Sequence, residues 1–174
     1  MRSWIAAHKG LFFTGVALAV VGAIVTLTVF QPQKLFIDDE ANEAVPMATT
    51  QPTGSASTQD EPVVLARGDF RNLNHDSDGS AVALRLADGR RIIRFEDFSV
   101  ENGPDLFVYL SSAPLNSPDD DDFNKDFVSL GKLKGNKGSQ NYEVPASVDL
   151  SKYARVVIWC KRFASGFAVA GLTA

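Results

Sequence analysis

The chain has 174 residues and a formal net charge of −4, with 45% hydrophobic residues, as in an ordinary globular protein. It has no basic face or arginine-rich tract, so the composition gives no indication of nucleic-acid binding. The single cysteine, Cys160, excludes an intrachain disulfide, a multi-cysteine zinc site and haem attachment through a CxxCH motif.

Residues 1–10 form a short N-terminal segment, followed by an uncharged apolar run over residues 11–30. This run is long enough to cross a bilayer as a helix. Arg2 and Lys9 precede it and acidic residues follow from Asp38, so we expect a cytoplasmic N-terminus and an extracytoplasmic C-terminal part. The alternative is a cleaved signal peptide, whose apolar region is usually shorter and ends in an A-x-A site. The sequence favours a single-pass anchor in the cell membrane, with the lipid bilayer as the partner of residues 11–30.

Residues 31–61 are rich in Gln, Thr, Ser, Ala and Pro and show no apolar periodicity. This composition predicts a flexible linker rather than a folded element. A coil of this length reaches on the order of 30 Å. The domain that follows is therefore expected to be tethered near the membrane.

Residues 62–174 read as one domain of short strands separated by turns, with no long helical period. Asp88-Gly89 is a strong hairpin signal between two alternating segments. The expected strands are residues 63–66, 69–73, 81–86, 91–95, 106–110, 127–130, 141–144, 156–160 and 166–170. Strands at this spacing predict an all-β domain, either an antiparallel sandwich or a barrel.

Cys160 ends an apolar segment of β-branched and aromatic residues, which reads as a buried strand. Side chains alternate along a strand, so Cys160 should share one face with Val156, Ile158 and Arg162. A nearby cation favours the reactive thiolate, and the charged residues after Cys160 could supply one. The other explanation is that Cys160 is a small apolar residue of the core, which is the usual place of a free cysteine.

Other chemistry has less support in the sequence. His75 is the only histidine of residues 62–174, so a serine hydrolase would depend on it, and no Gly-x-Ser-x-Gly motif is present. No spacing motif supports a metal site that combines His75, Cys160 and a carboxylate, so we predict no metal site. The acidic run 119–122 lacks the EF-hand spacing and reads as a solvated loop. The glycine- and lysine-rich stretch 131–140 lacks the Walker spacing and reads as a hairpin connection.

Seven stretches in residues 65–172 resemble the DM-13 domain family, an electron-transfer module also found beside DOMON domains in animal cell-surface proteins. The matching residues are 68–70, His75 with Gly79, 84–98, 102–106, 108–111, 130–145 and 148–163. With its N-terminal apolar run, the chain is similar to a bacterial, membrane-anchored member of this family.

The resemblance implies that Cys160 acts in redox chemistry, either as a bare thiol or as the ligand of a prosthetic group such as haem. Arg162 and His75 are then candidates for tuning the sulfur. Similar family members often carry histidine where this chain has Phe107, which removes a candidate second ligand. The cofactor therefore stays unknown, and the sequence does not establish whether the protein is an enzyme.

Two functions of different classes follow from these observations. The first is a membrane-anchored redox or electron-transfer domain that works through Cys160 with a redox partner not yet known. The second is a non-enzymatic cell-surface binding module that uses its loops on a rigid β scaffold. A metal-dependent hydrolase is a weaker third hypothesis. The environment of Cys160 separates the first two.

Overall fold

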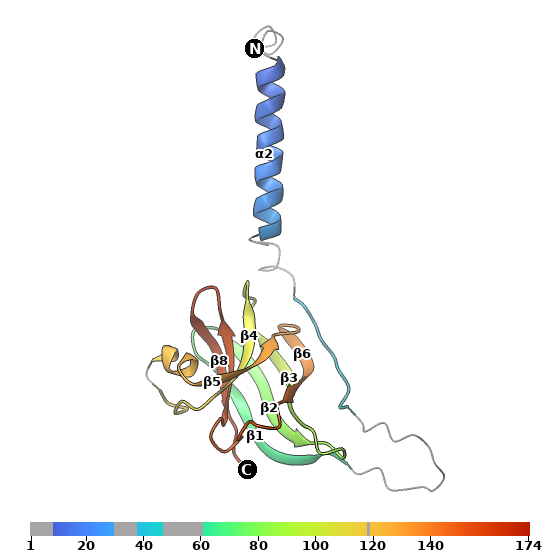
Figure 1. Cartoon of the computed structure of the whole chain (residues 1–174), viewed down its shortest axis with the longest axis vertical. Coiled ribbons are helices and arrows are strands. Elements are labelled where there is room, and N and C mark those ends of the chain that lie inside the picture. The colour runs from blue at the N-terminus through green and yellow to red at the C-terminus, as the bar shows by residue number, and fades with distance from the viewer. Residues whose placement is uncertain (1–8, 30–37, 47–60, 118) are drawn as a thin grey trace, which may run out of the picture. The chain divides into compact units, whose positions relative to one another are not determined.

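The computed structural model describes residues 9–29, 38–46, 61–117 and 119–174 (Figure 1). These residues fall into two units, Met1–Ile37 and Asp38–Ala174. Each unit is described here by itself.

Helix α2, Lys9–Val29, is the helix of the first unit. Within the part of the chain that the structure describes, no helix is both long enough and apolar enough to cross a membrane. The membrane anchor over residues 11–30 stays a prediction from the sequence.

The second unit is an antiparallel sheet of eight strands. The strands are β1 (Val63–Asn72), β2 (Ser77–Arg85), β3 (Arg91–Val100), β4 (Leu106–Ser111), β5 (Phe127–Lys132), β6 (Lys137–Val144), β7 (Arg155–Cys160) and β8 (Ser165–Gly171). Their order is β5-β4-β7-β8-β1-β2-β3-β6, and the edge strands β5 and β6 approach each other. The sheet therefore curls into a nearly closed barrel, and the predicted all-β class is confirmed in the form of a barrel (Figure 1).

Close backbone contact between β1 and β8 helps the barrel to curl. A Cβ atom at Gly68 would lie 2.0 Å from the carbonyl oxygen of Gly171, so only glycine fits there. The two segments 63–66 and 69–73, expected as separate strands, are one continuous strand β1 with a register shift between Val64 and Ala66. A bulge of this kind lets a strand bend without ending.

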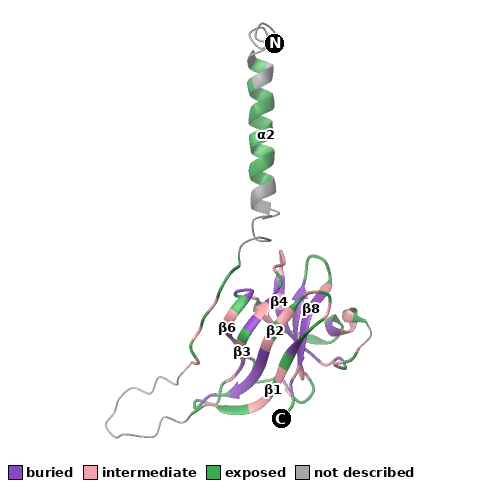
Figure 2. Cartoon of the chain, turned by 180° about the vertical axis from the view of Figure 1, so that it is seen from behind, coloured by how far each residue is buried: buried purple, intermediate pink, exposed green. Residues whose placement is uncertain are grey.

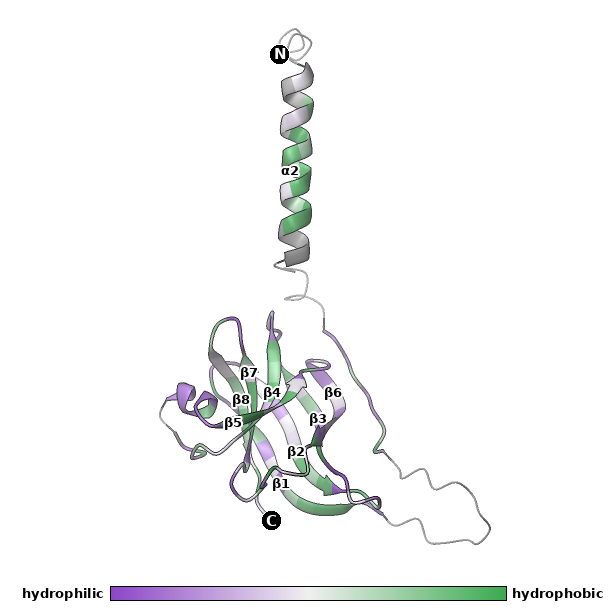
Figure 3. Ribbon diagram, in the orientation of Figure 1, coloured by the Kyte–Doolittle hydropathy of each residue, from purple (hydrophilic) through white to green (hydrophobic). Residues whose placement is uncertain are grey.

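The interior of the barrel is filled by inward side chains from all eight strands, with β5 contributing the half-buried Val128 and Leu130, and the buried strands stand out in Figure 2. Phe95 lies at its centre, with ring centroids 5.0 Å from Phe70, 4.8 Å from Phe98 and 5.1 Å from Tyr142. Apolar residues also line much of the outer surface of some strands, as the hydropathy colours show (Figure 3).

A second cluster covers the outside of β4, β7 and β8, and it contains Trp159 and Tyr109. The connection between β4 and β5 folds over this outer face and includes the short 3₁₀ helix η2, Asp120–Asn124. Phe123 of η2 is fully buried in the cluster. A third, smaller cluster lies on the outer face of β2 and β3, where Val45 packs against it. Strands with two buried faces explain the near-continuous apolar runs of the sequence.

Residues 38–44, here called the strap, lie along the free edge of β6 and belong to the same unit as the barrel. Glu40 bridges Lys137 in parallel orientation, and the N–H groups of Ala41 and Glu43 donate to the carbonyls of Lys137 and Ser139. The strap thus covers an edge that would otherwise present unpaired backbone groups. The sequence assigned these residues to the flexible linker 31–61, of which residues 31–37 and 47–60 lie outside the described part.

Candidate functional site

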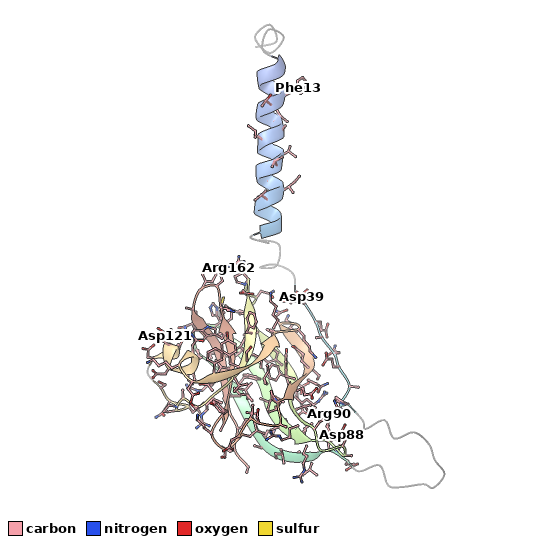
Figure 4. The ribbon with its side chains drawn as sticks, in the orientation of Figure 1. Phe13, Asp39, Asp88, Arg90, Asp121 and Arg162 are labelled. Atoms are coloured by element: carbon pink, nitrogen blue, oxygen red, sulfur yellow. The ribbon has the colours of Figure 1, made fainter. Side chains whose placement is uncertain are left out.

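Four turns meet at the end of the barrel where Cys160 lies, and we call this the Cys160 end. Because the strands run alternately up and down, the turns 73–76, 101–105, 133–136 and 161–164 all fall at this end. Backbone hydrogen bonds join them, from Glu101 N–H to the carbonyl of Asp76 and from Lys161 N–H to that of Asp105. Figure 4 shows Arg162 at this end of the barrel and Asp88 with Arg90 at the other.

Cys160 is the last residue of β7, and its side chain is fully buried in the barrel interior. It shares the inner cluster with Val156 and Ile158, as the strand alternation predicts, while Trp159 faces the outer cluster. Its direct neighbours across the sheet are Leu106 on β4 and Ser165 on β8. The sulfur therefore lies inside the barrel, one residue from the turn that closes β7 and β8.

His75 lies at the surface of the same end, with its imidazole stacked on the buried ring of Phe167. The ring centroids are 3.6 Å apart and the planes differ by 20°. The Nδ1 atom of His75 lies 2.7 Å from the Oε2 atom of Glu101, which fixes the orientation of the ring. Phe167 belongs to the interior cluster that contains Cys160, so a histidine at the surface and the buried cysteine are in contact with the same apolar cluster.

Gly103 contacts Leu106 and Phe167, two side chains of the interior cluster that contains Cys160, which we call the cover. A Cβ atom at this position would lie 2.8 Å from Cδ2 of Leu106 and 2.9 Å from Cζ of Phe167. The backbone of the 101–105 turn thus presses on both side chains, and Leu106 is the direct cross-strand neighbour of Cys160. Any larger residue at 103 would push the cover away from the sulfur.

Arg162 does not continue the face of Cys160, because β7 ends at Cys160 and residues 161–164 form a turn. Its side chain is exposed and has no hydrogen bond or ion pair with the residues that the structure describes. Arg162 therefore does not lie on the strand face of Cys160, contrary to the expectation from strand alternation. Lys161 lies over the ring of Phe107, with Nζ 5.3 Å from the centroid.

Phe107 pairs with Trp159 across the sheet and packs on the outer face of the barrel, whereas Cys160 faces inward. A side chain at position 107 thus points to the opposite side of the sheet from the sulfur. A histidine at this position would not ligate the same group as Cys160 from inside the barrel.

The arrangement does not fit a haem. The sulfur is covered by packed apolar side chains, and the imidazole of this end is held by Glu101 and Phe167. Within the described residues, no group of three or more His, Cys, Asp or Glu side chains is arranged to hold a metal ion.

The acidic run 119–122 lies in the connection over the outer face. Asp119 caps η2 by accepting a hydrogen bond from the N–H of Asp121 at 3.0 Å, and Asp122 pairs with Lys125 at 2.6 Å. Asp120 accepts a hydrogen bond from Asn74, and burial is the largest cause of the raised pKa of its carboxyl group. The carboxylates of Asp119, Asp120 and Asp122 thus have separate structural partners.

The sequence does not indicate that Phe167, Glu101, Gly103 and Leu106 lie at the same end of the barrel as Cys160. Glu101, Gly103 and Leu106 follow one another closely in the chain, but Phe167 comes from β8, and no spacing connects it with them. Only the pairing of β7 with β4 and β8 brings the two groups to Cys160.

A model of the family described as electron transfer DM13 matches residues 69–172 of the chain. The chain belongs to the DM13 family. The matched region contains all eight barrel strands, the first of them in part, together with His75 and Cys160. No curated protein and no solved structure matches the chain. The strap and the first residues of β1 precede the matched region.

Proposed function

We propose that the DM13 domain of this protein transfers electrons through the thiol of Cys160. The observation that carries the proposal is the position of this residue at the end of the barrel, where its cross-strand neighbour is Leu106 and it shares the interior cluster with Phe167. Cys160 is also the only sulfur atom of residues 62–174, which contain no methionine. Arg162 and His75 stay candidates for adjusting its chemistry, and His75 has the closer structural connection, through Phe167.

A single thiol transfers electrons by exchange with a disulfide of a partner. The thiolate of Cys160 attacks one sulfur of the partner's disulfide, the new S–S bond forms, and the other sulfur leaves as a thiolate. Cys160 is oxidised in this step and the partner's disulfide is reduced. Since the chain has no second cysteine, a second partner with two thiols must release Cys160. Its first thiolate attacks the sulfur of Cys160 and frees the remaining thiolate of the first partner, and its second thiolate then forms the second partner's own disulfide and frees Cys160, so two electrons pass from the dithiol to the first partner's disulfide.

We also propose that residues 11–30 attach this domain to the membrane with the barrel on the extracytoplasmic side. The support for this proposal is the apolar run and the charge difference between its flanks. An oxidising compartment outside the cytoplasm would supply the disulfides that such a thiol needs.

The test uses the full-length chain with glutathione disulfide under native conditions. We expect a mixed disulfide at Cys160, detected by intact mass, that dithiothreitol reverses, and no such product in Cys160→Ser. The visible absorption spectrum should show no Soret band. Modification only after the barrel unfolds would overturn the thiol mechanism and favour the second candidate, a binding module in which Cys160 is a packing residue, as its complete burial suggests. A Soret band lost in Cys160→Ser would instead support a haem.

A further inference from the structure

The carboxylate of Asp38, at the start of the strap, fastens the strap to two turns of the Cys160 end. Its Oδ1 atom accepts hydrogen bonds from Nδ2 of Asn136 at 2.8 Å and from Nδ2 of Asn102 at 3.3 Å. Its Oδ2 atom pairs with the ammonium group of Lys137 at 2.5 Å. The hydrogen bond from Lys137 is the largest cause of the lowered pKa of Asp38, so the carboxylate is ionised throughout the physiological range.

Asn136 is the buried centre of this contact, with only 4% of its surface exposed. Its Oδ1 atom accepts the N–H of Asp39 at 2.7 Å, while its Nδ2 group also donates to the carbonyl of Val100 at 3.2 Å. Val100 is the last residue of β3, immediately before the 101–105 turn. One side chain thus joins the strap to the base of that turn.

The 101–105 turn contacts both the cross-strand neighbour and the chain neighbour of Cys160. Glu101 holds the imidazole of His75 at 2.7 Å. Gly103 presses on Leu106 and Phe167, and the carbonyl of Asp105 accepts the N–H of Lys161, the residue after the cysteine, at 3.0 Å. Asn102, in the middle of the turn, is the residue that Asp38 binds. Successive contacts therefore lead from the strap, through the 101–105 turn, to the neighbours of Cys160.

We infer that Asp38 is a positioning residue for the Cys160 site. Its carboxylate keeps the 101–105 turn closed over the sulfur, and the reactivity of the thiol depends on a residue outside the region that matches the DM13 family. The inference deepens the proposed function and rests on it, because it concerns access to the same thiol. It implies that the segment leading to the N-terminal apolar run controls how readily a partner's disulfide reaches Cys160.

A purely structural strap would give a different pattern. It would stabilise the β6 edge equally along its length, so a defect at either end would have the same effect on the barrel. Glu43 provides the matched comparison, because it is the second acidic anchor of the strap. It pairs with Lys134 at 2.7 Å and accepts the N–H of Asn141, yet it has no hydrogen bond to the 101–105 turn.

The experiment measures the rate at which 4,4′-dithiodipyridine, a neutral disulfide, reacts with Cys160 in the full-length folded chain. We expect Asp38→Ala to raise this rate about tenfold, the factor expected when hydrogen bonds to a charged group are lost. Glu43→Ala should change it less than about twofold, although it also weakens the strap. Asp38→Asn keeps an oxygen that accepts from Asn136 and Asn102, so it should restore a rate near that of the unaltered chain.

Two further measurements make the result decisive. Hydrogen exchange at the N–H of Lys161, which bonds to Asp105, should speed up in Asp38→Ala and not in Glu43→Ala. Unfolding in urea should show that all variants are folded during the assay.

Equal rates in Asp38→Ala and Glu43→Ala would overturn the inference. So would reaction only in proportion to global unfolding in every variant. The proposed function fails separately, if the unaltered chain forms no mixed disulfide with glutathione. In that case, if folded Asp38→Ala still reacts faster with 4,4′-dithiodipyridine than the folded unaltered chain does, the positioning role of Asp38 is established.

Discussion

Gln140 is a polar side chain in the barrel interior with no exposed surface, so its hydrogen bonds must all be made within the protein. Its Oε1 atom accepts from the hydroxyl of Tyr142 at 2.6 Å, and its Nε2 group donates to the carbonyl of Gly135 at 2.7 Å. The Tyr142 hydroxyl accepts the N–H of Lys134 at 3.0 Å. This network fixes the turn before β6, which carries Asn136 and receives the strap.

Tyr142→Phe should lower the free energy of unfolding by about 1–3 kcal/mol, because it leaves the N–H of Lys134 and one lone pair of Gln140 unpaired. Burial is the largest cause of the raised pKa of Tyr142, which lies above the value of 10.0 of an unfolded tyrosine. Below that pH the stabilisation is fully present. Above it the unfolded chain releases a proton that the folded chain keeps, so stability falls with rising pH.

Urea unfolding of both chains at pH 7 and at pH 11 checks this prediction. The difference between the unaltered chain and Tyr142→Phe should shrink at the higher pH. A constant difference across this range would show that the hydroxyl is not buried as described.

At the scale of elements, the strap and β6 depend on glycines that allow two backbones to approach closely. A Cβ atom at Gly135 would lie 2.3 Å from the carbonyl oxygen of Asp39, and one at Gly138 would lie 2.5 Å from that of Ala41. Backbone atoms cannot move aside as the end of a side chain can. The glycine-rich stretch 131–140, which the sequence predicted to be a hairpin connection, thus also forms the surface that the strap contacts.

Gly135→Ala should detach the strap while the barrel stays folded. We expect faster hydrogen exchange at the N–H groups of Ala41 and Glu43, which bond to β6, and unchanged protection in β7 and β8. Gly89→Ala is the control, because Gly89 has a φ of +84° but nothing within 4 Å of the added atom. That control should cost about 1–2 kcal/mol through backbone strain alone and leave the strap in place. A strap that stays protected in Gly135→Ala would contradict the close approach.

The sequence predicted most of the elements correctly because alternation and turn residues are local signals. Each expected strand of the domain has a counterpart in the barrel, and the Asp88-Gly89 turn joins β2 to β3. The strap was not predicted, because its residues lack apolar periodicity. They are held by backbone hydrogen bonds and by charged anchors to Lys134 and Lys137, which leave no pattern in the chain.

At the scale of the whole molecule, barrel closure determines the site. Cys160 could be recognised as the end of a buried strand, and its inward direction followed from alternation with Ile158. Its neighbours could not be recognised, because Leu106 and Phe167 meet only through the pairing of β4, β7 and β8. Arg162 was expected on the face of Cys160 because the alternation was extended two residues past the predicted strand end at residue 160, where the chain instead turns. Local patterns therefore identify the cysteine, while the cover over it depends on long-range pairing.

The last prediction concerns how the barrel is retained at the membrane. Residues 47–60 have the polar composition of a protease-sensitive linker, and they connect the strap to β1. A cut there leaves the strap on the N-terminal fragment that contains the apolar run. The barrel then stays bound through the contacts that the strap and the adjoining Val45 make with β6, with the turns of the Cys160 end and with the outer face of β2 and β3.

We expect protease added to intact cells to cut this linker, with the barrel released slowly at low salt and faster at high salt. Salt weakens the exposed ion pairs of Lys137 with Asp38 and of Lys134 with Glu43. Gly135→Ala should release the barrel at once after the same cut, since its strap is already detached. A domain found in the medium without protease, beginning after residue 30, would show that the apolar run is cleaved and would contradict the anchor. Equal release rates for Gly135→Ala and the unaltered chain would instead show that the strap does not hold the barrel.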